Sequence, residues 1–464
     1  MANFEGQFHC GVKDCTITIK HVYTGPAIYK SQNLKIQFMR TIRVPDNAGE
    51  LELPPSLGAF PLFKVRDYAN RLPPEMTDKG GVFFPMYQKE AMWIDFTASS
   101  PFMIKIYAGG VNVVSGEHKT EDMDTKFRRL RQIFEGKSIQ DYVVVPDQPW
   151  LDGIAVSPGV VRQFVAMPMG QGYTVEAQLT GEETAGSLQF EITPTFPLMM
   201  KKVTGDFYIN IKGPDGTFTI HCSPFDCVED IQVRIRDITD IMVVAQRLTF
   251  DYGYGARKTL AECHVEKGDT LRLSKALVGG ATVDMPMGIA AGGKIKQMIR
   301  ADTEDTTNWF KDAKMTIPVQ VLNSAVFRYV TGENPPPCLF NASTYVMAGL
   351  PFFGMYDEPS GISGDFDAVK SVNVIEQKRG LADGSEASVH PRLTKLDQKG
   401  HRITIPDRFV HSAIRDPDAL LNPAGPLREF RTVADLKKEL KDESKDVDLD
   451  TPLHSETGTW CVII

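Results

Sequence analysis

Residues 207–222 read FYINIKGPDGTFTIHC, and they carry the clearest structural pattern in the centre of the chain. The run Pro214-Asp215-Gly216 combines three residue types that favour a turn. On both sides of it, apolar side chains alternate with polar ones, at Ile209, Ile211, Phe218, Ile220 and Cys222. Alternation around a turn predicts two antiparallel strands joined as a hairpin.

A helix and two further strands are predicted after the hairpin. Helical spacing begins after Asp226, with apolar residues on one face at Val228, Ile231 and Ile235. Short alternating runs then predict a third strand through Leu248 and Phe250 and a last one through Leu271 and Leu273. We therefore expect residues 206–280 to form a unit in which the helix packs on the sheet. Its buried set should be Ile209, Val228, Ile231, Ile235, Leu248, Phe250 and Leu271.

This ββαββ order resembles the β-grasp fold of the ubiquitin family. The matching motifs are Gln246-Arg247-Leu248 before the third strand, Lys258-Thr259-Leu260, Asp269-Thr270-Leu271-Arg272-Leu273 and the diglycine Gly279-Gly280. The resemblance covers residues 206–280 and implies a central ubiquitin-like domain with a four- or five-stranded sheet.

The resemblance also locates a binding surface. Ubiquitin receptors grip an isoleucine, a histidine and a valine, and the matching positions here hold Thr249, Arg272 and Ser274. Two apolar anchors are hydroxyl residues in this chain, so a hydrophobic grip is largely lost. We expect Arg247, Thr249, Arg272 and Ser274 to form a surface that binds protein partners through polar contacts.

The end of the resembling segment permits two interpretations. Cleavage after Gly280 would release a ubiquitin-like modifier, which needs a free terminal glycine. However, the family's tail arginines are replaced by Ala276 and Val278, and a long chain follows Gly280. We favour a domain fixed within a larger protein, and keep the modifier precursor as an alternative.

Residues 1–200 are predicted to be a β-rich, sandwich-like region. Short alternating or β-branched runs recur between turn residues, at 16–20, 34–38, 93–97, 103–107, 141–145, 163–166, 173–177 and 188–192. Several segments of the chain resemble uncharacterised, mainly fungal, proteins, namely 92–97, 106–111, 149–158 and 347–353. That resemblance implies a shared architecture and no known activity.

One helix, at about residues 122–135, should interrupt these strands. Phe127, Leu130 and Phe134 form an apolar stripe, and Lys126, Arg128, Arg129 and Arg131 are expected on the other face. A basic amphipathic helix can bind a membrane or a calmodulin-type partner. We favour the alternative that the apolar stripe packs on the sheet and the basic face is solvated.

The C-terminal part divides into two predicted regions. Residues 281–430 mix strand-like runs, such as 315–322, with short helices and many breakers, which favours an α+β region. Residues 431–464 begin with a capping box, Thr432-Val433-Ala434-Asp435, before a short helix with Leu436 and Leu440 on one side. The charged stretch after it is typical of a disordered tail.

The sequence Cys461-Val462-Ile463-Ile464 matches a CaaX box. A final isoleucine favours geranylgeranylation of Cys461. One lipid alone anchors weakly, and neither a polybasic stretch nor a second nearby cysteine accompanies this box. We expect a cytoplasmic protein with peripheral membrane association.

Composition excludes several other functions. Apolar residues make up 42% of the chain and charged residues 24%, as in ordinary globular proteins, and a net charge of −8 argues against nucleic-acid binding. The seven cysteines are too scattered for a disulfide framework or a zinc site. We find no catalytic motif and expect no cofactor and no metal. The predicted function is a non-enzymatic protein-interaction adaptor, and an enzyme with an unrecognised site is the alternative.

Overall fold

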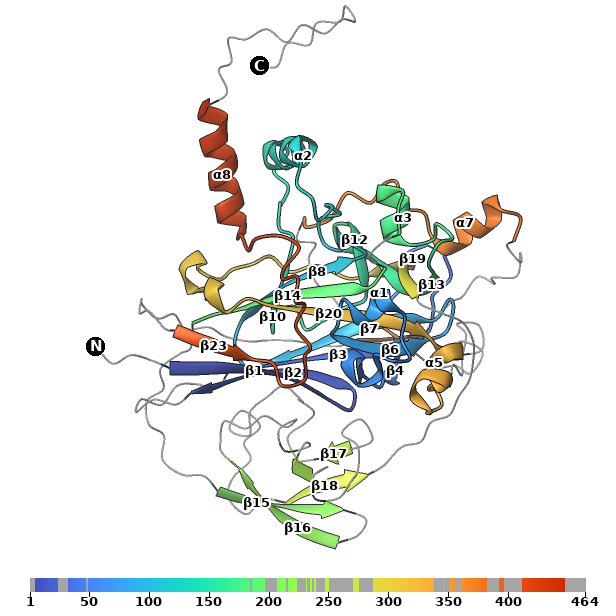
Figure 1. The fold of residues 1–464 in the computed structure, drawn as a ribbon, viewed down its shortest axis with the longest axis vertical. Coiled ribbons are helices and arrows are strands. Elements are labelled where there is room, and N and C mark those ends of the chain that lie inside the picture. The colour runs from blue at the N-terminus through green and yellow to red at the C-terminus, as the bar shows by residue number, and fades with distance from the viewer. Residues whose placement is uncertain are drawn as a thin grey trace, which may run out of the picture.

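The fold is largely β, with one large mixed sheet and few helices (Figure 1). This computed structural model describes residues 5–23, 32–46, 49–183, 186–196, 207–213, 216–222, 231, 234–235, 238, 247–249, 270–274, 287–337, 345, 351–354, 361–381, 392–395 and 411–446.

The large sheet has 17 strands. They are β1 (Glu5–Lys13), β2 (Thr16–Tyr23), β3 (Asn33–Thr41), β4 (Ser56–Ala59), β5 (Phe63–Lys64), β6 (Val82–Met86), β7 (Ala91–Ala98), β8 (Phe102–Ala108), β9 (Val111–Asn112), β10 (Val143–Val145), β11 (Trp150–Leu151), β12 (Gly153–Ser157), β13 (Val160–Pro168), β14 (Leu188–Pro194), β19 (Met287–Lys296), β20 (Met315–Asn323) and β23 (His411–Arg415). Two short parallel strands, β21 (Pro351–Gly354) and β22 (Arg392–Lys395), pair separately.

The helices are short and lie around this sheet. They are α1 (Pro74–Thr77), α2 (Met123–Phe134), α3 (Val175–Thr180), α5 (Ser324–Thr331), α7 (Val372–Lys378) and α8 (Val433–Asp446). Three 3₁₀ turns are η1 (Val65–Tyr68), η3 (Thr306–Asn308) and η4 (Lys311–Ala313). Among the described helices, none has the length and apolar content that crossing a bilayer requires.

Strands from the two ends of the chain pair with each other. Strand β13 is antiparallel to β19, β14 is antiparallel to β20, and β1 is parallel to β23. The sequence pattern predicts residues 1–200 and 281–430 as separate regions. Their pairing in one sheet corrects that separation, because sequence periodicity identifies strands and not their distant partners.

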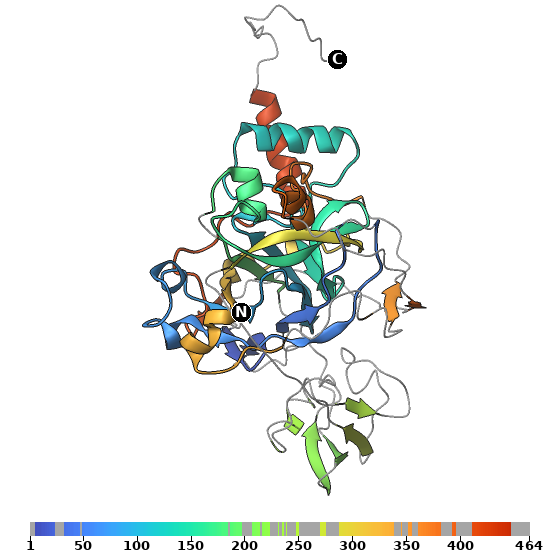
Figure 2. The same ribbon diagram turned by 90° about the vertical axis from the view of Figure 1, so that its right-hand side faces the viewer.

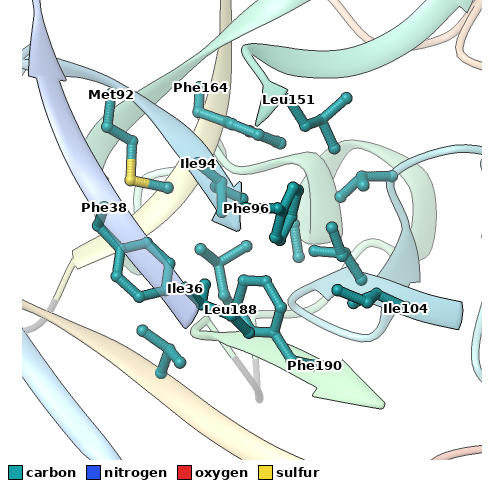
Figure 3. Packing of buried hydrophobic residues seen from close by; sticks show 14 of the residues in the cluster. Ile36, Phe38, Met92, Ile94, Phe96, Ile104, Leu151, Phe164, Leu188 and Phe190 are labelled. Carbon is teal, nitrogen blue, oxygen red and sulfur yellow. The ribbon is translucent and has the colours of Figure 1, made fainter. Parts of the chain in front are cut away.

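The sheet encloses one main hydrophobic core. In Figure 3, side chains of β3, β7, β8, β13 and β14 meet there, including Phe38 and Phe190, whose rings lie 5.6 Å apart edge to face. Side chains of β3 alternate between buried and half-buried, whereas all seven residues of β8 are buried. Lys105 of β8 is accommodated because its ammonium lies 2.7 Å from the Asp141 carboxylate. The core also includes Ile317 of β20 and Leu420, so both flanking regions contribute to it.

A separate four-stranded sheet lies between β14 and β19 in the sequence. Its strands are β15 (Phe207–Gly213), β16 (Gly216–Cys222), β17 (Arg247–Thr249) and β18 (Thr270–Ser274). Their order is β16-β15-β18-β17, with β15 and β18 parallel and the outer pairs antiparallel. The chain leaves the large sheet after β14, forms this second sheet and returns at β19.

Local structure follows the sequence in most places. Strands occur where seven of the eight predicted N-terminal runs lie, and α2 and β20 match their predicted ranges. The capping box at α8 is confirmed, since the Asp435 amide donates to Thr432 Oγ1 at 3.1 Å and the Thr432 amide donates to Asp435 Oδ2 at 2.8 Å.

The predicted strand at residues 173–177 is wrong. Thr174 caps a helix there by accepting a hydrogen bond from the Ala177 amide, and Gly181 ends that helix, α3, in the left-handed conformation. These two capping residues outweigh the β-branched character of the stretch.

Candidate functional site

The four positions expected to bind partners lie on the neighbouring strands β17 and β18. The register pairs Arg247 with Ser274 and Thr249 with Arg272. Residues paired across antiparallel strands, and residues two apart along a strand, are close neighbours in a sheet. The fold thus brings together two short segments that lie far apart in the sequence.

Apolar side chains form the interior of this inserted unit. Ile209 of β15 is buried, as are Ile231 and Ile235, which confirms three members of the predicted set. Arg234 Nη1 donates to the His221 carbonyl oxygen at 2.8 Å and so links the segment around Ile231 to β16. Ile211, Ile220 and Cys222 are buried in addition.

Other predicted residues cannot be compared with the structure. Val228, Phe250, Gly280 and Cys461 lie outside the described residues, and so does the rest of the stretch from 447 to 464. The lipidation site and the possible cleavage site therefore stay predictions.

Helix α2 presents an apolar stripe to solvent. The side chains of Met123, Phe127, Leu130 and Phe134 are 60, 61, 39 and 89% exposed. On the opposite face, Thr125 and Arg129 are buried. The expectation of a packed apolar stripe is therefore wrong. The expected basic face is divided, because Arg129 is buried and Lys126 and Arg128 are half-buried, whereas Arg131 is exposed.

An ion cluster beneath α2 explains this orientation. Arg129 Nε lies 2.9 Å from Glu117 Oε1, and Arg428 Nη1 lies 2.6 Å from Glu117 Oε2. All three side chains are buried. Glu121 forms further ion pairs with Arg129 and Arg431. Because a buried guanidinium needs a carboxylate partner, these contacts hold the side of α2 that carries Arg129 inward.

The cluster also shifts the acidity of its carboxyl groups. Burial opposes ionisation of Glu117, but hydrogen bonds and charge from Arg129 and Arg428 outweigh it and lower the Glu117 pKa. Burial also opposes ionisation of Glu121, but a hydrogen bond from Arg431 and the charges of the neighbouring arginines outweigh it and lower the Glu121 pKa to about 2. Both groups are ionised in the folded protein at neutral pH.

Sequence reasoning missed Glu117 and Arg428. The acidic residues Glu117 and Glu121 just before a helix with consecutive arginines were a usable local signal. Arg428 had no such signal, because it follows Glu117 by 311 residues.

Two cavities provide the other candidate sites. One of about 260 Å³ is lined by Trp150, Lys296, Gln297 and Arg300, among others. The second, of about 200 Å³, is lined by Lys79, by Glu75 and Glu183, and by methionines, among others. Burial lowers the pKa of Lys79. Lysine and glutamate side chains are used in acid–base catalysis, so this second cavity is the candidate site for the alternative that the protein is an enzyme.

A buried carboxyl group lies beside the first cavity. Gln297 Nε2 donates to Asp152 Oδ2 at 2.8 Å, and the Asp152 amide donates back to Gln297 Oε1 at 2.8 Å. Burial raises the Asp152 pKa to about 7, and hydrogen bonds from Trp150 and Gln297 offset only part of that effect. Asp152 therefore titrates near neutrality in the folded state.

The thiols of Cys10 and Cys15 are unsuited to reactive roles. Cys10 and Cys15 are both buried. Burial raises the pKa of Cys10 far above its usual range and that of Cys15 to about 11, so both thiols stay protonated at neutral pH. In the part of the chain that the structure describes, acidic, histidine and cysteine side chains form no group of three suited to a metal ion.

Likeness to known proteins is limited to solved structures. No family model matches the chain, and no curated protein matches it. Among solved structures, a ubiquitin of Caldiarchaeum subterraneum is similar at 22% identity, over 16% of this chain and all of that protein, with a TM-score of 0.16.

Proposed function

We propose that this protein is a non-enzymatic adaptor in which an inserted ubiquitin-like domain binds protein partners. The observation that carries the proposal is the register of β17 and β18, in which Arg247 faces Ser274 and Thr249 faces Arg272. Four polar positions adjacent on one small sheet suit a protein contact made by hydrogen bonds and charge. The ubiquitin-like assignment is further supported by the strand order of the unit and by buried Ile231 and Ile235.

A fixed domain accounts for the chain better than a modifier precursor. Cleavage after Gly280 would separate β13 and β14 from their partners β19 and β20. Those strands share one core, so the two products would stay associated or lose their fold. The inserted unit therefore acts as part of the whole protein.

We also propose that Cys461 is geranylgeranylated and that the protein is cytoplasmic and associates peripherally with a membrane. The CaaX match supports this. Intact-mass spectrometry of protein from its native cells tests it. A mass that includes the lipid is expected, and an unmodified Cys461 followed by Val462, Ile463 and Ile464 would refute it.

Site-specific photo-crosslinking tests the binding surface in the full chain. A photoreactive amino acid at Thr249 should give discrete protein adducts in native cells. The matched control carries it at Thr217, which is exposed on β16 of the same unit. Equal adducts from both positions, or none from Thr249, would contradict the proposed surface.

A further inference from the structure

We propose that α2 lies in the interface of an anionic lipid bilayer, with Phe127 and Phe134 inserted among the lipids. The inference builds on the proposed membrane association and assigns to the folded part of the protein a second membrane contact besides the lipid. It starts from the exposed apolar stripe of Met123, Phe127, Leu130 and Phe134.

The stripe is narrow and continuous. At about 100° per residue, its four members fall within about 60° of arc around the helix. Two of them are phenylalanines, whose side chains bury a large apolar area when they leave water. Interfacial helices bind membranes by placing such a stripe at the boundary between headgroups and acyl chains.

Charge complementarity favours an anionic bilayer as the occupant. Lys126 and Arg131 flank the stripe, each about 70° from its centre on opposite sides. Long basic side chains at these positions can keep their charges at the headgroups while their stems lie along the apolar surface. A basic residue near an anionic leaflet strengthens attraction to it.

The orientation of α2 is fixed by the body of the protein. Arg129 is held by Glu117 and Glu121 on the inward face, so the helix does not have to turn over to expose its apolar side. The stripe is thus already exposed in the unbound protein, and α2 loses little conformational freedom when it binds a membrane.

The helix also lies at a suitable end of the molecule. Figures 1 and 2 show α2 at the end that carries α8, and in Figure 2 it runs crosswise to the long axis. Ile133 of α2 packs with Leu436 and Leu440 of α8. Cys461 follows the end of α8 by 15 residues in the sequence, a length of chain that can span up to about 50 Å, so a lipid there could reach the same membrane as the stripe on α2.

Vesicle flotation of the full chain carrying Cys461→Ser tests the inference without a lipid anchor. The protein should bind phosphatidylcholine vesicles that contain phosphatidylserine. The variants Phe127→Ser and Phe134→Ser should each lower the partition coefficient about tenfold. Tyr329→Ser is the matched control, because Tyr329 is 84% exposed on α5, and it should bind as the parent does.

Two further measurements sharpen the test. Arg131→Gln should weaken binding about fivefold, and only to vesicles with phosphatidylserine. Fluorescence of Phe134→Trp should be quenched by brominated lipids, whereas that of Tyr329→Trp should not. Folding of each variant is checked by its thermal unfolding midpoint, which should match the parent's because the replaced side chains are exposed.

Several outcomes would overturn the inference. One is a parent protein that does not bind anionic vesicles, and another is equal binding by the Phe127→Ser and Tyr329→Ser variants. A third is a parent protein that is dimeric and does not bind vesicles, and that Phe127→Ser converts to a monomer. In that case the stripe would bind a second copy of the chain. The proposed prenylation is judged separately by native mass, so either idea can fail without the other.

Discussion

Replacing Glu117 with glutamine should destabilise the protein and release α2. Glu117 is 3% exposed and accepts from Arg129 at 2.9 Å and Arg428 at 2.6 Å. The substitution removes the charge but keeps the volume, so both buried guanidinium groups must share Glu121. Breaking a buried ion pair costs about 3–5 kcal/mol. We expect a loss of that size in the free energy of unfolding.

Chemical denaturation of the full chain measures the loss, and amide hydrogen exchange locates it. Exchange should accelerate in α2 and in residues 428–446, which Arg428 ties to the cluster. The control is Glu135→Gln at the C-cap of α2. The Glu135 carboxylate pairs with Lys137 in solvent, so this substitution should give no measurable change. A Glu117→Gln protein as stable as this control would refute the reasoning.

Acid provides an independent measure of the same cluster. The folded-state pKa of Glu121 is about 2, below its unfolded value of about 4.3. The stability it contributes is therefore present above about pH 4.3 and is lost as pH falls toward 2. Glu121→Gln should flatten the plot of the free energy of unfolding against pH in this range. If the plot below about pH 4.3 is unchanged in the variant, the cluster does not govern the acid sensitivity of the protein.

Three further predictions concern other parts of the chain. Asp152 has a folded pKa of about 7, above its unfolded value of about 3.9, so its contribution to stability is complete below about pH 4 and is lost by pH 7. This decline in the free energy of unfolding amounts to about 4 kcal/mol, and Asp152→Asn should remove it. Denaturation at several pH values measures the effect. A variant with the same pH profile as the parent would count against a buried charge at Asp152. Ile231→Ala should cost about 2–5 kcal/mol and expose the inserted unit to protease, because Ile231 is fully buried; unchanged stability would contradict the packing. Cys461→Ser should shift the native protein toward the soluble fraction on cell fractionation, and an unaltered distribution would argue against a lipid at this position.

Local sequence pattern predicted much of the secondary structure for a physical reason. Alternation and capping are properties of neighbouring residues, so β3, β20 and the capped helix α8 could be located from the sequence. In the inserted unit, strand alternation likewise placed Ile209 in the interior, and helical spacing placed Ile235 there. In each case, the signal that allowed the prediction lies within a few neighbouring residues of the sequence.

Long-range contacts account for what the sequence did not predict. The periodicity of α2 identifies an apolar stripe, but not whether the stripe faces the protein or solvent. That choice depends on Glu117 and on Arg428, which are 311 residues apart. In the same way, nothing near β14 indicates that β20 is its partner. The candidate membrane surface therefore emerged only with the fold.

The parallel pairing of β1 with β23 imposes an order on folding during synthesis. His411 pairs with Glu5, so β1 waits for about 400 residues of synthesis before its partner exists. At about 5–20 residues per second, that wait is about 20–80 s. Strand β13 waits for β19 in the same way, while the four strands between residues 207 and 274 are all synthesised before β19 emerges. On the ribosome, the inserted unit can mature first, and the large sheet needs protection of its early strand edges until the last strand emerges.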